Sequence, residues 1–115
     1  MNRVFVYGTL RGHETAIPAV VKGFVRNDTG PYPAIEPGDG VVYGEIIHVD
    51  ELGLAQLDRI EGYDPACPEG SFYHRYESKN GVYVYIANAA NYNWTYEHSM
   101  EEIRKAVETA EIKTQ

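Results

Sequence analysis

Residues Arg3 to Gly12 have the sequence RVFVYGTLRG, an apolar run followed by a glycine-containing turn. Apolar or aromatic side chains occupy both faces of Arg3–Tyr7, which is typical of a strand in the middle of a sheet. Gly8 then breaks the strand, and a turn of this kind can present successive backbone N–H groups to a carboxylate or an oxyanion. The spacing fits an ordinary tight turn equally well.

Further strands are expected on both sides of one internal helix. Residues 19–25 and 40–49 form apolar runs that predict strands, with a bulge or bend at Gly44. Between them, NDTGPYPAIEPGDG contains three prolines and three glycines and is predicted to be mostly loop with a short extended piece.

A hairpin is predicted where Asn80-Gly81 separates two β-rich runs. A two-residue loop would pair Lys79 with Val82. The rings of Tyr76, Tyr83 and Tyr85 would then lie on one face of the hairpin.

The internal helix is predicted over Asp50–Ile60, with Asp50 as its N-cap and Gly62 as its terminator. Within it, Leu54 and Leu57 mark an apolar face.

Glu61 extends that apolar face at the C-terminal end of the helix, seven residues after Leu54. Burial and the partial negative charge of the helix terminus are both expected to raise its pKa. A carboxyl group with a pKa near neutrality can serve as a general acid or base. If the helix instead frays after Ile60, Glu61 faces water.

The chain is predicted to be a single α+β domain over residues 1–115. From residue 96 onward, Met100, Ile103 and Val107 recur at helical spacing among charged residues, which predicts a helix that packs on the sheet. Mostly strands, with one inserted and one C-terminal helix, indicate a small curved or closed sheet.

Composition narrows the function. The net charge of −7 argues against non-specific nucleic-acid binding, which needs a basic surface. No apolar stretch is long enough to span a membrane, no signal-peptide pattern is found, and the single Cys67 cannot form an intrachain disulfide. We therefore expect a cytoplasmic protein without membrane contact.

Motifs for cofactors are missing from the sequence. It has neither a G-x-x-x-x-G-K-[ST] phosphate loop nor G-x-G-x-x-G, and its four histidines show no H-x-x-x-H spacing. Neither a metal nor another cofactor is expected.

Four motifs, in order, resemble those of the γ-glutamylcyclotransferase-like family. The family's Y-G-[ST]-L-[RK] signature resembles VFVYGTLR, and its V-x-G-E-[VIL] strand resembles GVVYGEII. Its L-D-x-x-E-G segment resembles LDRIEGY, and its Y-x-R with a tyrosine-bearing strand resembles YHR followed by VYVY. These motifs span Arg3 to Asn88 and leave the C-terminal helix, at about 96–111, outside the family match. The GTLR turn, without an asparagine near its leucine, resembles the smaller branch that includes γ-glutamylamine cyclotransferase-like proteins.

The resemblance implies a small mixed β-barrel with a cavity at one end, and it implies roles for particular residues. The turn that binds the γ-glutamyl group through backbone amides corresponds to Tyr7, Gly8, Thr9 and Leu10. The catalytic glutamate corresponds to Glu61, and a cavity tyrosine to Tyr85. Tyr73 and Arg75 match the Y-x-R positions, whose role is less defined.

The implied reaction needs neither a cofactor nor a protein nucleophile. The substrate's own α-amine attacks the γ-carbonyl, which yields 5-oxoproline and a free amine. Holding the amine against the carbonyl exploits the advantage of intramolecular attack, up to about 7–11 kcal/mol in well-oriented cases. One carboxyl group can take a proton from the ammonium and return one to the leaving amine.

Three hypotheses for the function follow. The first is this enzyme, acting on a small γ-glutamyl amine or peptide. The second is a non-catalytic module of the same fold that binds a small ligand. The third is a partner-binding protein that uses the C-terminal helix. The loop Asp64–Ser71 fits either a cavity rim that selects the leaving amine or an ordinary connection.

Overall fold

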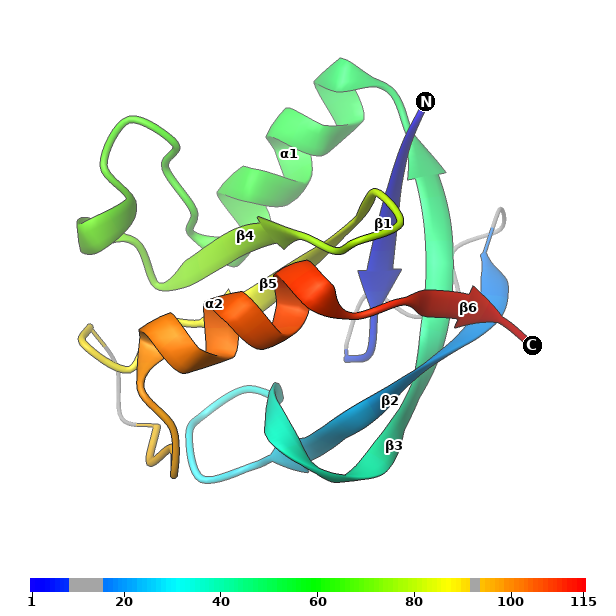
Figure 1. Cartoon of the computed structure of the whole chain (residues 1–115). Coiled ribbons are helices and arrows are strands. Elements are labelled where there is room, and N and C mark those ends of the chain that lie inside the picture. Colours follow the sequence, from blue (N-terminus) through cyan, green and yellow to red (C-terminus); the bar gives the residue numbers. More distant parts are fainter. Residues whose placement is uncertain (9–15, 92–93) are drawn as a thin grey trace.

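The computed structural model describes residues 1–8, 16–91 and 94–115. Their elements, in chain order, are β1 (Asn2–Val6), β2 (Ile17–Asn27), β3 (Ala34–Val49), α1 (Glu51–Glu61), the 3-10 helix η1 (Pro68–Gly70), β4 (Tyr73–Glu77), β5 (Val82–Ala87), α2 (Met100–Thr109) and β6 (Ile112–Thr114) (Figure 1). The α+β class is confirmed. Neither α-helix in these ranges is long and apolar enough to cross a membrane.

The strands form one sheet in the order β4-β5-β1-β3-β2-β6, with β1 and β5 parallel and the other pairs antiparallel. In the described residues this sheet is open, with β4 and β6 at its edges, so a closed barrel is not found. Strand β6 is only three residues long. Helix α2 packs against β4 and leads into β6, so a helix and not a row of hydrogen bonds joins the two edges (Figure 1).

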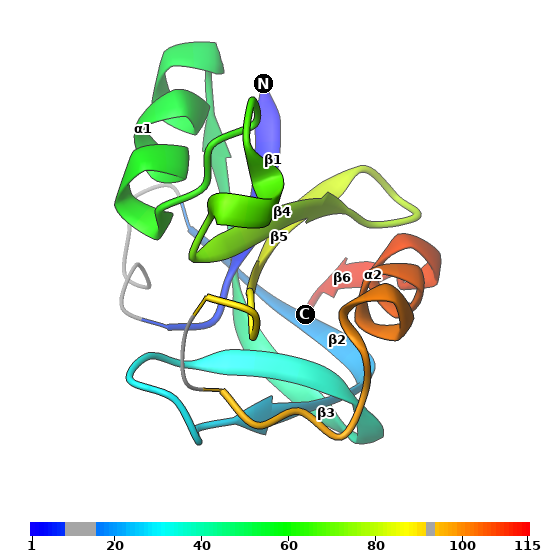
Figure 2. The ribbon, with the colours of Figure 1, turned by 90° about the vertical axis from the view of Figure 1, so that its left-hand side faces the viewer.

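Strand β1 is central, as its apolar sequence predicts, and both of its faces are buried. Val4 and Val6 pack in a cluster that includes Leu54 and Leu57 of α1. Phe5 and Tyr7 belong to a second cluster, which includes residues of α2. The two helices therefore cover different faces of the sheet (Figure 2).

Strand β3 begins earlier than its sequence suggests. Ala34, Ile35 and Glu36 are buried and pair with β2, although they lie in the proline- and glycine-rich stretch predicted to be loop. Paired and buried residues override the local turn signals here.

The irregularity expected at Gly44 occurs in β2 instead. The register shifts between Lys22 and Phe24, around Gly23, which has a φ of 84°. Gly44 keeps a regular register with Ala19. A Cβ atom at Gly44 would lie 2.3 Å from the Val6 carbonyl oxygen, so its glycine allows β1 and β3 to approach closely.

The β4–β5 hairpin differs from its predicted register by one residue. Gly81 has a φ of 79° and donates its N–H to the Ser78 carbonyl, and Ser78 donates to the Val82 carbonyl. This is a three-residue loop with a glycine bulge, the common alternative to a two-residue turn. Arg75 consequently pairs with Tyr85, and Tyr76 pairs with Val84, so Tyr76 does not share a face with Tyr83 and Tyr85.

Helix α2 is shorter than the predicted 96–111 but packs as expected. Ser99 and Glu102 form a capping box at its start. Ile103 and Val107 are buried in the core. The strand β6 that follows was not predicted, because three residues carry no readable alternation.

The burial of Ile103 gives a stability prediction. Ile103→Ala removes a completely buried side chain and should lower the free energy of unfolding by about 2–5 kcal/mol in urea denaturation. Lys105→Ala, at an exposed position of the same helix, should change it by less than about 0.5 kcal/mol. Equal effects of the two substitutions would show that α2 does not contribute to the core.

Candidate functional site

A cavity of about 510 Å³ lies where the C-terminal end of α1 meets the end of β1. Among the described residues it is lined by Phe5, Val6, Tyr7, Gly8, Tyr32, Pro33, Arg59, Ile60, Glu61, Gly62, Phe72, Tyr73, Tyr85 and Trp94. The volume is typical of a small-molecule site. Most of the lining is apolar or aromatic, and its charged side chains are Arg59 and Glu61.

Glu61 is a half-buried carboxyl group in this lining. Helix α1 runs through Glu61 and ends at Gly62, whose φ of 67° is the left-handed conformation that favours glycine, so the helix does not fray after Ile60. Burial raises the pKa of Glu61 to about 7. The pKa values of Tyr7 and Tyr73 are raised mainly by burial of their phenols. The negative charge of nearby Glu61 raises them further.

The turn after β1 contributes Tyr7 and Gly8 to the cavity. Arg26 donates a hydrogen bond of 2.7 Å from Nη1 to the Tyr7 carbonyl oxygen. The Tyr7 carbonyl and the Gly8 N–H belong to the same trans peptide and point in opposite directions. The Gly8 N–H therefore points away from Arg26. Thr9 and Leu10, the other predicted residues of this turn, lie outside the described residues.

Three tyrosines of the cavity donate their hydroxyl protons to the protein. Tyr7 donates to the Tyr85 carbonyl oxygen at 2.5 Å, and Tyr73 donates to the Pro33 carbonyl oxygen at 2.9 Å. Tyr85 donates to Oδ1 of Asp58 at 2.6 Å. These bonds fix the rings and leave the hydroxyl oxygens able only to accept further hydrogen bonds.

Arg75 does not line the described part of the cavity and instead forms a partly buried ion pair with Asp58. Its Nη1 lies 2.9 Å and 2.8 Å from the two carboxylate oxygens of Asp58. The guanidinium carbon also lies 4.8 Å from the ring centroid of Tyr83 and 5.5 Å from that of Tyr63. Asp58 therefore joins α1 to both strands of the hairpin.

Asp58 was not among the predicted site residues, although the sequence contains a signal for it. Asp58 follows Leu54 by four residues and precedes Glu61 by three, which places it on the apolar face of the helix. A charged residue on such a face needs a partner. The partner Arg75 was already a candidate, but the predicted register put Ile86 opposite it, where the structure has Tyr85.

Trp94 closes part of the cavity wall and comes from a segment between β5 and α2. Its ring meets Tyr73 edge-on, with centroids 5.6 Å apart, and its Nε1 donates to the Tyr32 carbonyl oxygen at 3.0 Å.

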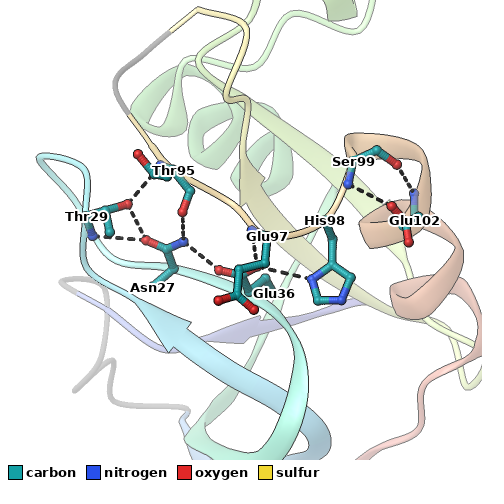
Figure 3. Close-up of polar contacts among 8 residues, drawn as sticks. All are labelled: Asn27, Thr29, Glu36, Thr95, Glu97, His98, Ser99 and Glu102. Atoms are coloured by element: carbon teal, nitrogen blue, oxygen red, sulfur yellow. Dashed lines mark hydrogen bonds and ion pairs between the residues drawn. The ribbon is translucent and has the colours of Figure 1, made fainter.

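The residues after Trp94 are attached to β2 and β3 by a polar cluster (Figure 3). Glu36 accepts hydrogen bonds from the side chain of Asn27 at 2.7 Å and from the Glu97 N–H at 2.9 Å, and one of its oxygens lies 3.2 Å from Nδ1 of His98. Asn27 also donates to the Thr95 carbonyl oxygen at 2.9 Å. Burial alone would raise the pKa of Glu36, but these partners outweigh it and hold the pKa below its ordinary value.

The loop Asp64–Ser71 contributes no residue to the described lining of the cavity. Gly62 and Phe72, on either side of it, do line the cavity, and the Phe72 N–H donates to the Gly62 carbonyl oxygen at 2.9 Å. Within residues 1–8, 16–91 and 94–115, no three His, Cys, Asp or Glu side chains gather as a metal site would require.

Comparison with known proteins adds a family match. A family model described as gamma-glutamyl cyclotransferase, AIG2-like, matches residues 4–110, which include α2. The gamma-glutamylcyclotransferase family protein YtfP of Escherichia coli K12 is 32% identical over 68 residues, and that of Citrobacter rodentium is 35% identical over 68 residues. Each alignment covers 50% of this chain and 60% of the relative.

Solved structures show the same fold. The solution structure of Escherichia coli ytfP is similar with a TM-score of 0.54 and 25% identity, covering 81% of this chain and 90% of that one. The crystal structure of the uncharacterized protein PH0828 from Pyrococcus horikoshii has a TM-score of 0.58 at 18% identity, covering 93% and 92% of the two chains.

The ion pair of Asp58 should be important for stability. Asp58→Ala removes the ion pair of the half-buried Arg75 and the acceptor of the buried Tyr85 hydroxyl, and it should lower the free energy of unfolding by about 1.5–3 kcal/mol. Glu111→Ala, which breaks the exposed pair with Lys79, should cost at most about 1 kcal/mol. Urea denaturation of both variants distinguishes the two costs, and a small effect at Asp58 would contradict its role as the link between α1 and the hairpin.

Glu36 should make stability fall in acid. Its pKa is lower in the folded protein than in the unfolded chain, so its contribution is present above the unfolded pKa and is lost as pH falls through the folded pKa. Unfolding free energies measured from pH 7 down to about pH 3 should therefore fall less in Glu36→Gln than in the unmodified protein. Glu97→Gln, at an exposed neighbour, should keep the original pH dependence. The same slope in all three proteins would contradict this role for Glu36.

Proposed function

Since this chain belongs to the AIG2-like gamma-glutamyl cyclotransferase family, we propose that it cyclises a small γ-glutamyl amine or peptide to 5-oxoproline and releases the amine. The observation that carries the proposal is the half-buried Glu61. Burial raises its pKa to about 7, and it lines the same cavity as Tyr7 and Gly8. A titrating group of this kind in a cavity is the expected mark of acid–base catalysis.

Glu61 moves the protons in this reaction. Its carboxylate accepts a proton from the substrate's α-ammonium, and the free amine then attacks the γ-carbonyl carbon. A carbon–nitrogen bond forms in the five-membered ring, and Glu61 returns the proton to the leaving nitrogen as the bond to the leaving amine breaks. The ring nitrogen then still carries one proton too many, which passes through the same carboxyl group to the departing amine, so that the products are the neutral lactam of 5-oxoproline and an ammonium. A group with a pKa near 7 can both accept and donate at neutral pH.

The cavity offers different partners to the negatively and positively charged groups of the substrate. The Gly8 N–H points away from Arg26 and is a donor for the α-carboxylate or for the oxygen that becomes negative during attack. The hydroxyl of Tyr73 donates its proton to the Pro33 carbonyl, so its oxygen is an acceptor suited to the ammonium. Tyr85 lines the cavity, but its hydroxyl is bound to Asp58 and lies beside Arg75. The Tyr7 hydroxyl donates to the backbone carbonyl of Tyr85 and so helps to hold Tyr85 in place.

The Glu61→Gln variant tests the assigned base. Production of 5-oxoproline from a panel of γ-glutamyl amines and dipeptides should fall by about 10²–10⁴-fold, because the amide cannot carry the proton. Above pH 7 the variant should be at least as stable as the unmodified protein, since burial disfavours the charged carboxylate. Glu51→Gln, at the exposed other end of α1, is the matched control and should retain activity. Undiminished turnover in Glu61→Gln would show that the base is wrongly assigned.

The pH dependence provides a second test. Because burial raises the pKa of Glu61 to about 7, the carboxylate that accepts the proton is lost as pH falls through that value. The kcat/KM for any substrate found should decrease about tenfold per pH unit below pH 7. A profile flat down to pH 5 would contradict the proposal.

The alternative hypothesis is a non-catalytic module of the same fold that binds a small ligand. It would be supported if compounds of the panel raise the melting temperature of the protein but none yields 5-oxoproline. Product from any panel member excludes it.

A further inference from the structure

The outer part of the cavity has an apolar surface that the proposed proton transfer does not use. Nine large hydrophobic side chains are exposed in the described residues, and three of them, Tyr32, Ile60 and Phe72, line this cavity. Ile60 is 65% exposed and Phe72 is 49% exposed. We refer to these three residues as the apolar rim.

Two residues of the apolar rim, Ile60 and Phe72, are held in defined positions near Glu61. Ile60 is the residue before Glu61 in α1. The Phe72 N–H donates to the Gly62 carbonyl oxygen at 2.9 Å, and its carbonyl accepts from the Asn88 N–H at 2.8 Å. The Phe72 side chain packs so closely on Gly62 that a Cβ there would lie 2.8 Å from its ring. Side chains from two segments are thus placed next to the proton-transfer group.

The cavity has more room than a γ-glutamyl group fills. Its volume of about 510 Å³ is in the range of sites for much larger, drug-sized ligands. The leaving amine must lie next to Glu61, because that group returns the proton to it. Beside Glu61 the rim offers apolar side chains, and among the described lining residues only Arg59 adds another charge.

We propose that the apolar rim binds the leaving group, and that the substrates are γ-glutamyl amides of amines with an aromatic or branched alkyl substituent. This inference rests on the proposed function. An apolar substituent gains by leaving water at the rim. A hydroxyl or ammonium group placed against Ile60 and Phe72 gains no hydrogen-bond partner from these two side chains, so it has no comparable advantage there.

Two neutral amides test the inference, γ-glutamyl-phenethylamide and γ-glutamyl-ethanolamide. The full chain should cleave the phenethylamide with a kcat/KM at least about 10-fold higher, measured as 5-oxoproline formed. In Phe72→Ala and in Ile60→Ala this ratio should fall several-fold. Ile60→Ala is at an exposed helical position where alanine favours the helix, so it keeps the test valid if Phe72→Ala does not fold. Leu52→Ala, an equally exposed apolar residue of α1 outside the cavity, should leave the ratio unchanged.

The outcomes separate the inference from the proposed function. If both amides are cleaved equally well, or if neither rim variant changes the ratio, the inference is overturned while the enzyme assignment stands. If neither amide nor any other γ-glutamyl compound yields 5-oxoproline, both are overturned.

Discussion

The carboxylate of Asp58 connects the parts of the molecule that form the cavity. It binds the Arg75 guanidinium of β4 and the Tyr85 hydroxyl of β5, and it lies in α1 one turn before Glu61. The carbonyl of Tyr85 in turn accepts the hydroxyl of Tyr7, next to the turn after β1. A partly buried charge pair of this kind contributes little net stability relative to an apolar core, but it fixes a geometry, because the buried Asp58 is costly to leave without its partners. The position of Glu61 depends on that geometry.

The position of Glu61 in the cavity has a cost in free energy. The cavity lining is largely apolar, and the carboxylate of Glu61 is partly removed from water without a hydrogen bond from any described residue that offsets the cost. Such a cost is typical of functional sites, where a shifted pKa is useful. The network of Asp58 joins α1 to the hairpin, and the polar cluster around Glu36 attaches the residues that follow Trp94 to β2 and β3.

Much of the framework could be predicted from local patterns. The apolar β1, the caps of α1 at Asp50 and Gly62, and the buried Ile103 and Val107 of α2 each follow from spacing within a few residues. The half-buried position of Glu61 followed from the same helical face. The features that were missed depend on contacts distant in sequence. Strand β3 is longer than predicted because its first residues pair with β2. The sheet is open because α2, and not strand pairing, connects its two edges. The hairpin register is set by Gly81 adopting a positive φ, and a shift of one residue changed which side chains face Asp58.

Measuring the pKa of Glu61 is the most direct test of its proposed role in proton transfer. The carboxyl carbon of Glu61 can be followed by ¹³C NMR as a function of pH, with its signal identified by its absence from Glu61→Gln. A midpoint near pH 7 is the result expected from the burial of Glu61. A midpoint at the ordinary value of about 4.3 for an exposed glutamate would show that Glu61 is solvated and would remove the basis for its role in proton transfer.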